Sequence, residues 1–175
     1  MRIISGNYRG RKLETLEGED TRPTTDRVKE SIFNLIQFDV NGAVVLDLFS
    51  GSGALGIEAL SRGAKEVVFN DFNKKAVDII QKNLKGIKGE FKVENLPYGE
   101  FLKRNSTVFD LVFLDPPYKM DIEGEILAYF LNNGLSKNGK IVYESDRPIK
   151  MTCGFEPIKE KKYGKTYVTV LGRIL

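Results

Sequence analysis

From residue 43 onward, short apolar runs alternate with segments of helical periodicity, and this alternation limits the possible folds more than any other feature. Apolar runs of strand length stand at 43–48, 66–70, 91–94, 109–114 and 140–144, with helical patterns at 54–62, 74–84 and 123–132. Short apolar runs are typical of strands buried on both faces, and the helical segments provide crossovers between parallel strands. The alternation predicts an α/β fold with a doubly wound, mostly parallel sheet and helices on both faces.

The two ends of the chain depart from this pattern. Residues 155–161 and 166–173 are β-rich runs around a glycine turn, which predicts an antiparallel hairpin at one edge of the sheet. Residues 2–15 have the glycine-turned pattern of a small hairpin, and Thr25-Asp26 can then cap a helix expected to run to about Phe38. The apolar residues of this helical segment are expected in the core: Phe33, Leu35, Ile36 and Phe38.

The composition excludes several kinds of chemistry. The 175 residues suit one domain and include no histidine and one cysteine, Cys153. A Ser-His-Asp triad, an internal disulfide and a cysteine metal cluster are all excluded, so the chemistry must use carboxylates, hydroxyls, backbone groups or a bound cofactor. The longest apolar stretches, such as 111–114, are too short to cross a bilayer, and no signal-peptide pattern opens the chain, so a cytoplasmic protein is expected.

Charge is unevenly distributed. The chain carries a net charge of +3, yet residues 1–12 contribute +4 and residues 147–175 contribute +5, which leaves −6 for the residues between them. Basic ends around an acidic centre suggest a polyanionic partner held by the ends of the chain. Solvated surface lysines are the alternative explanation.

A glycine-rich loop follows the first apolar run. Asp47 ends that run and leads into Leu48-Phe49-Ser50-Gly51-Ser52-Gly53, whose glycines allow a sharp turn and close approach of a ligand. Asp71 stands 20 residues after Gly51, at the end of the next strand. An acid in that place accepts hydrogen bonds from ribose hydroxyls, so the pattern predicts an adenosine-like ligand.

Asp47 discriminates between two such ligands. Gly51-Ser52-Gly53-Ala54-Leu55-Gly56 also matches the fingerprint of a nicotinamide dinucleotide site. A carboxylate four residues before Gly51 would repel a dinucleotide pyrophosphate, whereas it can help to hold the positive α-amino group of a sulfonium cofactor. The loop favours S-adenosyl-L-methionine over NAD, and a purely structural glycine turn is the remaining alternative.

A second motif, Asp115-Pro116-Pro117-Tyr118, follows the run at 109–114 and lies at the carboxyl edge of the predicted sheet, where such folds bind ligands. The prolines remove two N–H donors and leave the Pro116 carbonyl free to accept. An exocyclic amine of a nucleobase is a poor nucleophile, because its lone pair is delocalised. Asp115 and the Pro116 carbonyl can accept its two N–H groups and turn the lone pair toward a methyl group, while Tyr118 stacks on the base. A Pro-Pro turn with Asp115 as a local cap is the alternative.

These motifs resemble those of a known family. Asp47–Gly53 is similar to motif I of class I methyltransferases, and Asp115–Tyr118 is similar to the D/N-P-P-Y/F motif of methyltransferases that modify amino groups of adenine or guanine. Three further stretches, Arg2–Leu13, Arg22–Glu30 and Tyr163–Thr166, resemble the RsmD family of 16S rRNA guanine-N2 methyltransferases.

The resemblance spans essentially the whole chain. It implies a Rossmann-like class I methyltransferase fold with a seven-stranded sheet, an RNA-binding N-terminal extension at residues 1–40 and a catalytic core at 41–175. It also implies methylation of the N2 amino group of one guanine in 16S rRNA, within the assembled or partly assembled small ribosomal subunit. A monomer that uses S-adenosyl-L-methionine and no metal is expected.

The resemblance also assigns the site residues. Those assigned to catalysis are Asp115, Pro116, Pro117 and Tyr118. Those assigned to the cofactor are Asp47, Phe49, Ser50, Gly51, Ser52, Gly53, Asp71 and Tyr98. Two positions depart from the family pattern: Asn73 replaces a second acid, and Pro97 stands where a polar side chain commonly meets the adenine. The adenine is therefore expected to be held mostly by backbone near Tyr98, with other residues, not identified from the pattern, as the alternative.

Arg9, Arg11 and Lys12, on the glycine-rich hairpin with Tyr8, are the leading candidates for RNA contact. Further basic side chains near the helix at 26–38 are expected either to contact phosphates or to be solvated: Arg22, Arg27 and Lys29. Thr25 and Asp26 have two open interpretations, a helix cap and a substrate contact.

Two other functions stay open. An adenine-N6 methyltransferase acting on DNA or RNA would use the same chemistry, although the chain is too short to include a separate target-recognition domain. A non-catalytic binding module that keeps the fold is the other, and the presence of Asp47, Asp71 and Asp115 argues against it.

Overall fold

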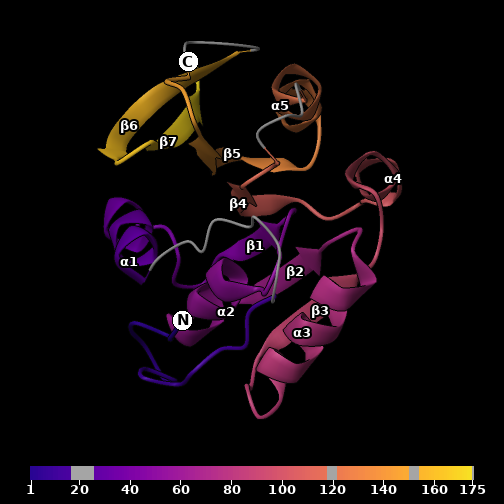
Figure 1. Ribbon diagram of the computed structural model, residues 1–175. Helices are drawn as coiled ribbons and strands as arrows, with labels where there is room; N and C mark the ends of the chain where they lie inside the picture. Colours follow the sequence, from indigo (N-terminus) through magenta and orange to yellow (C-terminus); the bar gives the residue numbers. More distant parts are fainter. Residues whose placement is uncertain (17–25, 118–121, 150–153, 175) are drawn as a thin grey trace.

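The computed structural model describes residues 1–16, 26–117, 122–149 and 154–174, and its central feature is one seven-stranded sheet (Figure 1). The strands are β1 Val44–Asp47, β2 Glu66–Asn70, β3 Glu90–Glu94, β4 Phe109–Leu114, β5 Leu135–Ser145, β6 Phe155–Tyr163 and β7 Thr166–Arg173. The helices are α1 Asp26–Leu35, α2 Ala54–Ser61, α3 Lys74–Leu84, α4 Tyr98–Arg104 and α5 Glu123–Asn132.

The strand order is β3-β2-β1-β4-β5-β7-β6. Strands β1 to β5 pair in parallel, β7 runs antiparallel to β5, and β6 runs antiparallel to β7. This confirms the predicted fold, including the C-terminal hairpin. The direction of winding reverses between β1 and β4, and a crevice for ligands forms at the carboxyl ends of the strands on either side of such a reversal.

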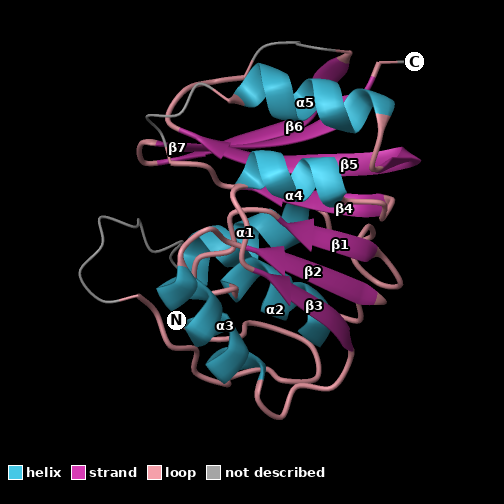
Figure 2. Cartoon of the chain, turned by 90° about the vertical axis from the view of Figure 1, so that its right-hand side faces the viewer, coloured by secondary structure: helices cyan, strands magenta, loops and turns pink. Residues whose placement is uncertain are grey.

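Successive residues of the strands enter two separate cores. Val45 and Phe113 pack with α1, α2, α3 and the N-terminal segment, whereas Leu46 and Leu114 pack with α4 and α5 on the opposite face. Figure 2 shows α4 and α5 on one side of the twisted sheet and α2 on the other. Because both faces of the central strands are covered, their residues are apolar without alternation, which is why these strands could be recognised in the sequence.

The element predictions failed where local periodicity was weak. The short helix α4 was missed, since its seven residues bury only Phe101 and Leu102. Strand β5 begins five residues earlier than expected: Leu135 pairs with Phe109, and a register shift absorbs the polar residues that precede Lys140. Such an irregularity interrupts the apolar pattern that identifies a strand.

The N-terminal region also differs in detail from its prediction. Residues 2–15 form a turn closed by one antiparallel bridge between Arg2 and Lys12, without an extended ladder. The assignment of Phe38 to the core is wrong: helix α1 ends at Leu35, and Phe38 lies in the following turn with 89% of its surface exposed.

Within the described residues, no helix combines the length and apolar character needed to span a membrane.

Candidate functional site

Asp47 ends β1 at the point where the winding of the sheet reverses. Only 3% of its surface is exposed. Its Oδ2 accepts a hydrogen bond from the Gly56 N–H at 3.1 Å, and its backbone carbonyl accepts one from Ser50 Oγ at 2.6 Å. Burial raises the pKa of Asp47 to about 7, against the opposing effect of the Gly56 N–H. The negative charges of Asp115 and Asp71 raise this pKa further, which shows that three carboxylates influence one small region.

Two glycines of the loop have different physical roles. Gly51 has φ +54°, and a Cβ added there would meet no atom within 4 Å, so the loop is bordered by open space at this point. Gly56 lies in α2, where an added Cβ would stand 2.3 Å from Cε1 of Phe69. Gly51 therefore leaves room for a ligand beside the loop, whereas Gly56 allows α2 to pack closely on β2.

The rest of the loop is held by hydrogen bonds to neighbouring elements. The Gly53 N–H donates to the Ser50 carbonyl at 2.7 Å, which closes the turn before α2. The Ser52 carbonyl accepts from Nδ2 of Asn83 in α3 at 3.0 Å. Ser50 Oγ also accepts from the Asn70 N–H at 3.1 Å, so the loop is tied to the end of β2.

Asp71 follows β2 and faces the same loop. Its Oδ2 accepts from the Gly51 N–H and its Oδ1 accepts from the Asn73 N–H, both at 2.9 Å. These two bonds fix the orientation of the carboxylate, and a carboxylate oxygen can accept more than one hydrogen bond. The geometry is suited to a vicinal diol such as a ribose.

The positions that depart from the family pattern have structural roles. Asn73 caps α3, with its side chain accepting from the Lys75 N–H at 3.0 Å, and Pro97 is the residue that precedes α4. Tyr98 packs against Phe49 with ring centroids 5.9 Å apart and donates its hydroxyl to Glu125 at 2.9 Å. This hydrogen bond to a carboxylate raises the pKa of Tyr98.

Asp115, Pro116 and Pro117 follow β4, the strand next to β1. Asp115 is partly buried, Pro116 is buried and Pro117 is exposed. The structure therefore brings this turn to the same edge of the sheet as the glycine loop. Tyr118 lies outside the described residues.

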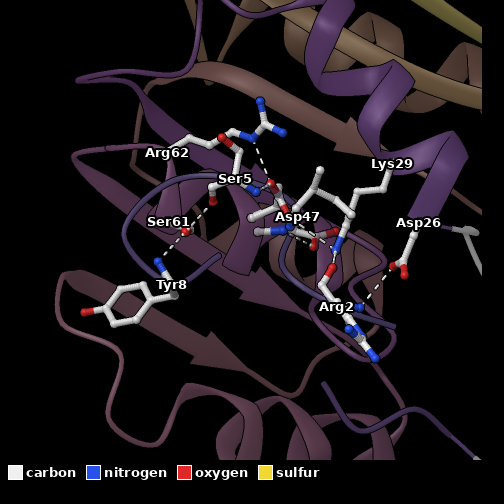
Figure 3. Close-up of polar contacts among 11 residues, drawn as sticks. Arg2, Ser5, Tyr8, Asp26, Lys29, Asp47, Ser61 and Arg62 are labelled. Carbon is white, nitrogen blue, oxygen red and sulfur yellow. Dashed lines mark hydrogen bonds and ion pairs between the residues drawn. The ribbon is translucent and has the colours of Figure 1, made fainter. Parts of the chain in front are cut away.

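The N-terminal segment is joined to α2 by a buried polar cluster (Figure 3). Glu58, fully buried in α2, accepts from the N–H groups of Ile4 at 2.8 Å and Ser5 at 3.0 Å. The same carboxylate forms ion pairs with Lys29 at 3.3 Å and with Arg62 at 2.8 Å. The expectation that Lys29 is solvated or contacts phosphate is wrong, because its side chain is fully buried and burial lowers its pKa.

Further hydrogen bonds continue this attachment. Ser61 Oγ donates to the Ser5 carbonyl at 2.6 Å and accepts from the Tyr8 N–H at 3.0 Å (Figure 3). Asn83 accepts from the Glu14 N–H at 2.8 Å and donates to the Glu14 carbonyl at 3.0 Å. Asn83 also donates to the Ser52 carbonyl, so its side chain connects the N-terminal segment directly to the glycine loop.

The residues expected to contact RNA fall into three groups. Arg9, Lys12 and Arg27 are exposed. Arg11 is partly buried and donates from Nη2 to the carbonyls of Asn83 and Lys85 at the end of α3. Arg22 and Thr25 lie outside the described residues, and the Asp26 carboxylate accepts from the Arg2 N–H at 3.0 Å.

Four residues of interest were not identified from the sequence. Glu58 had a detectable signal, because it is the one charged residue in the otherwise apolar or small sequence of α2. Asn83 had none, because its partners Glu14 and Ser52 are distant in sequence. Glu144 had none either, because nothing in the sequence distinguishes this buried carboxylate of β5 from an exposed one. Phe72 follows Asp71 directly and is 70% exposed, which makes it a candidate for stacking on a bound ring.

Comparisons with known proteins agree over nearly the whole chain. The family model described as "Conserved hypothetical protein 95" matches residues 1–172. Ribosomal RNA small subunit methyltransferase D of Haemophilus influenzae is 39% identical over 172 residues, covering 94% of this chain and 89% of that protein. The Escherichia coli protein of the same name is 38% identical over 144 residues, covering 82% and 73%. Among solved structures, yhhF from Escherichia coli has a TM-score of 0.88 at 35% identity and covers 99% of this chain and 97% of that one.

Proposed function

The chain belongs to the ribosomal RNA small subunit methyltransferase D family, and on this basis we propose that it transfers a methyl group from S-adenosyl-L-methionine to the N2 amino group of a guanine in 16S rRNA. The single observation that carries this proposal is the placement of Asp115 and Pro116 beside the glycine loop that begins at Asp47, at the winding reversal of the sheet. A methyl donor and an amine acceptor would meet at that edge.

The residues around the loop fit the cofactor. The carboxylates of Asp47 and Asp71 favour a ligand with positive charge, and the open space beside Gly51 admits one. The fixed carboxylate of Asp71 suits the ribose hydroxyls. When bound, the cofactor supplies an activated methyl group on a positively charged sulfur.

Asp115 and Pro116 orient the acceptor. The Asp115 carboxylate and the Pro116 carbonyl each accept one N–H of the exocyclic amine, which turns its lone pair toward the methyl group. Because both acceptors are set at the end of a buried strand, they require little reorganisation during the reaction. Preorganised polar groups of this kind account for much of the rate of many enzymes.

The N-terminal extension, residues 1–40, is proposed to hold the RNA. Arg9, Lys12 and Arg27 are exposed, and the segment that carries the first two is anchored to α2 and α3. Anchored basic side chains can neutralise phosphates without a large cost in ordering the backbone. The small ribosomal subunit, assembled or partly assembled, is the proposed substrate.

Labelled methyl transfer to purified small subunits, followed by nucleoside analysis, tests the proposal. The expected product is N2-methylguanine in 16S rRNA, with little transfer to duplex DNA or short random RNA. N6-methyladenine as the labelled product, or duplex DNA as the better acceptor, would replace this proposal with an adenine-N6 methyltransferase.

Asp115→Ala separates chemistry from cofactor binding. The variant should methylate at least about a hundredfold more slowly, while calorimetry shows nearly unchanged cofactor affinity. Asp78→Asn, which neutralises an exposed carboxylate on α3, is the matched control and should behave as wild type. Near-normal turnover by Asp115→Ala would remove Asp115 from the reaction.

A further inference from the structure

A small pocket lies against the catalytic turn that follows β4, and the end of β5 and the start of α5 also contribute to it. Its lining residues are Pro116, Pro117, Glu123, Tyr143, Glu144, Ser145, Asp146 and Arg147. Pro116 therefore borders both the proposed amine-binding position and this pocket. A base whose amino group reaches the Pro116 carbonyl would direct the neighbouring part of its ring toward the same place.

Glu144 is the buried carboxylate of this pocket. Its exposure is 5%, whereas Asp146 is exposed and Glu123 is partly exposed. Leu114 and Tyr143 pair across the parallel strands β4 and β5, so Asp115 and Glu144 each follow one member of the same pair. Adjacent strands lie about 4.8 Å apart, and side chains in equivalent places point to the same face of a sheet. Glu144 is therefore the neighbour of Asp115 along this edge.

Guanine and adenine differ beside the exocyclic amine. Guanine carries an N1–H donor next to its N2 amino group, and the N1 of adenine has a lone pair at the corresponding position next to N6. A carboxylate attracts the N1–H of guanine and repels the N1 lone pair of adenine. A hydrogen-bond acceptor next to Asp115 and Pro116 would thus favour guanine over adenine, while Asp115 and Pro116 orient the exocyclic amine.

We propose that Glu144 is the specificity-determining residue for guanine, with its carboxylate accepting the N1–H of the target base. This inference rests on the proposed guanine-N2 activity. Glu144 is favoured over Asp146 and Glu123 because it is buried and lies on a strand paired on both sides, with β4 and with β7. A hydrogen bond to a charged acceptor is stronger in such a dry, rigid place than at an exposed rim.

The first test compares Glu144→Gln with Asp146→Asn, which removes an exposed carboxylate from the same pocket. On small subunits that lack the methylation, Glu144→Gln should reduce kcat/KM for N2-methylguanine formation roughly ten- to hundredfold. Its cofactor affinity, measured by calorimetry, should be unchanged, and Asp146→Asn should stay close to wild type. Wild-type kcat/KM for Glu144→Gln would overturn the proposal.

The second test measures base selectivity, which a structural role alone would not alter. After the methylated nucleotide has been mapped, subunits are reconstituted with 2,6-diaminopurine at that position; this base keeps the 2-amino group but has a lone pair at N1. The wild-type protein should prefer guanine at least about tenfold. Glu144→Gln, whose amide can donate to N1, should lose most of this preference.

The outcomes separate the two proposals. A wild-type protein that forms no N2-methylguanine contradicts the proposed function itself. A wild-type protein that forms it but accepts both bases equally overturns the assignment of Glu144, and this result does not depend on how well the variant folds. An unchanged preference in a folded Glu144→Gln variant overturns it as well.

Discussion

At the scale of single residues, Asp47 of the proposed cofactor site is expected to reduce the stability of the ligand-free fold. Its carboxylate is buried with one described backbone donor, from Gly56, and lies in the field of two other acids. Burial of a negative charge near two other acids is unfavourable, which is why the pKa of Asp47 rises to about 7. A positively charged ligand would supply that compensation.

Replacement of Asp47 by Asn should therefore stabilise the ligand-free protein in a pH-dependent way. The folded pKa of about 7 lies above the ordinary value of 3.8 that the unfolded chain retains. Between these values the folded state binds more protons than the unfolded state, so wild-type stability falls as the pH rises and is constant above about pH 7. Denaturant titrations should show Asp47→Asn to be the more stable protein at pH 8, with the difference shrinking toward pH 4.

Cofactor binding should change in the opposite direction. Asp47→Asn should weaken S-adenosylmethionine binding by on the order of 1.5–3 kcal/mol, the usual range for a hydrogen bond to a charged group. Wild-type affinity should rise from pH 5.5 to about 7 as Asp47 ionises, whereas the variant should show a flatter profile. A variant that binds as tightly as wild type, or that is less stable at pH 8, would contradict this account of Asp47.

At the scale of elements, α2 joins the N-terminal segment to the glycine loop. The loop ends where α2 begins, and Glu58 and Ser61 of the same helix hold the backbone of residues 4–8. Gly6 makes this close approach possible, since a Cβ there would stand 1.8 Å from the Ser61 carbonyl oxygen. The proposed RNA-binding and cofactor-binding parts therefore share one rigid support.

The Glu58 cluster should be sensitive to which partner is removed. Glu58→Gln leaves Lys29 buried without its carboxylate and should cost about 3–5 kcal/mol of unfolding free energy. Lys29→Met should cost less, because an apolar chain of similar length fills the space and Glu58 keeps Arg62 and two backbone donors. Denaturant titration of both variants checks this order, and the reverse order would show that Lys29 is the more important member.

At the scale of the whole molecule, the exposed basic residues of the N-terminal segment are expected to determine RNA affinity. Arg9 and Lys12 are exposed, whereas Arg11 holds the carbonyls at the end of α3. The three residues should therefore respond differently to charge reversal, although the sequence presents them as one group.

Arg9→Glu and Lys12→Glu should weaken binding to small subunits or 16S rRNA without loss of stability or cofactor affinity. Each phosphate contact that is lost should reduce the slope of log affinity against log salt by about 0.7 on single-stranded RNA. Arg11→Glu should instead lower the melting temperature, because the α3 carbonyls lose their donor. Filter binding over a salt series, with melting curves for each variant, tests this separation, and equal stability loss in all three would contradict it.

Local pattern was sufficient to predict much of the fold. The bounds of β2, α3, β4 and α5 agree with expectation, and the parallel sheet and its C-terminal hairpin are confirmed. These elements are recognisable because backbone conformation and the burial of one or both faces impose a short period on the residues themselves. The glycine loop and the Asp115 turn were recognisable for a related reason: each is a continuous stretch with an unusual backbone requirement.

What the sequence alone determined was thus most of the series of elements, without α4, together with the family resemblance and the two loops at the sheet edge. The tertiary structure alone decided the pairing of Lys29 with Glu58, the cap that Arg11 provides for α3 and the place of Glu144 beside Asp115. Each of these relations joins residues more than 25 positions apart. Periodicity describes the neighbours of a residue along the chain, whereas the partner of a buried charge is decided by which elements the folded sheet brings together.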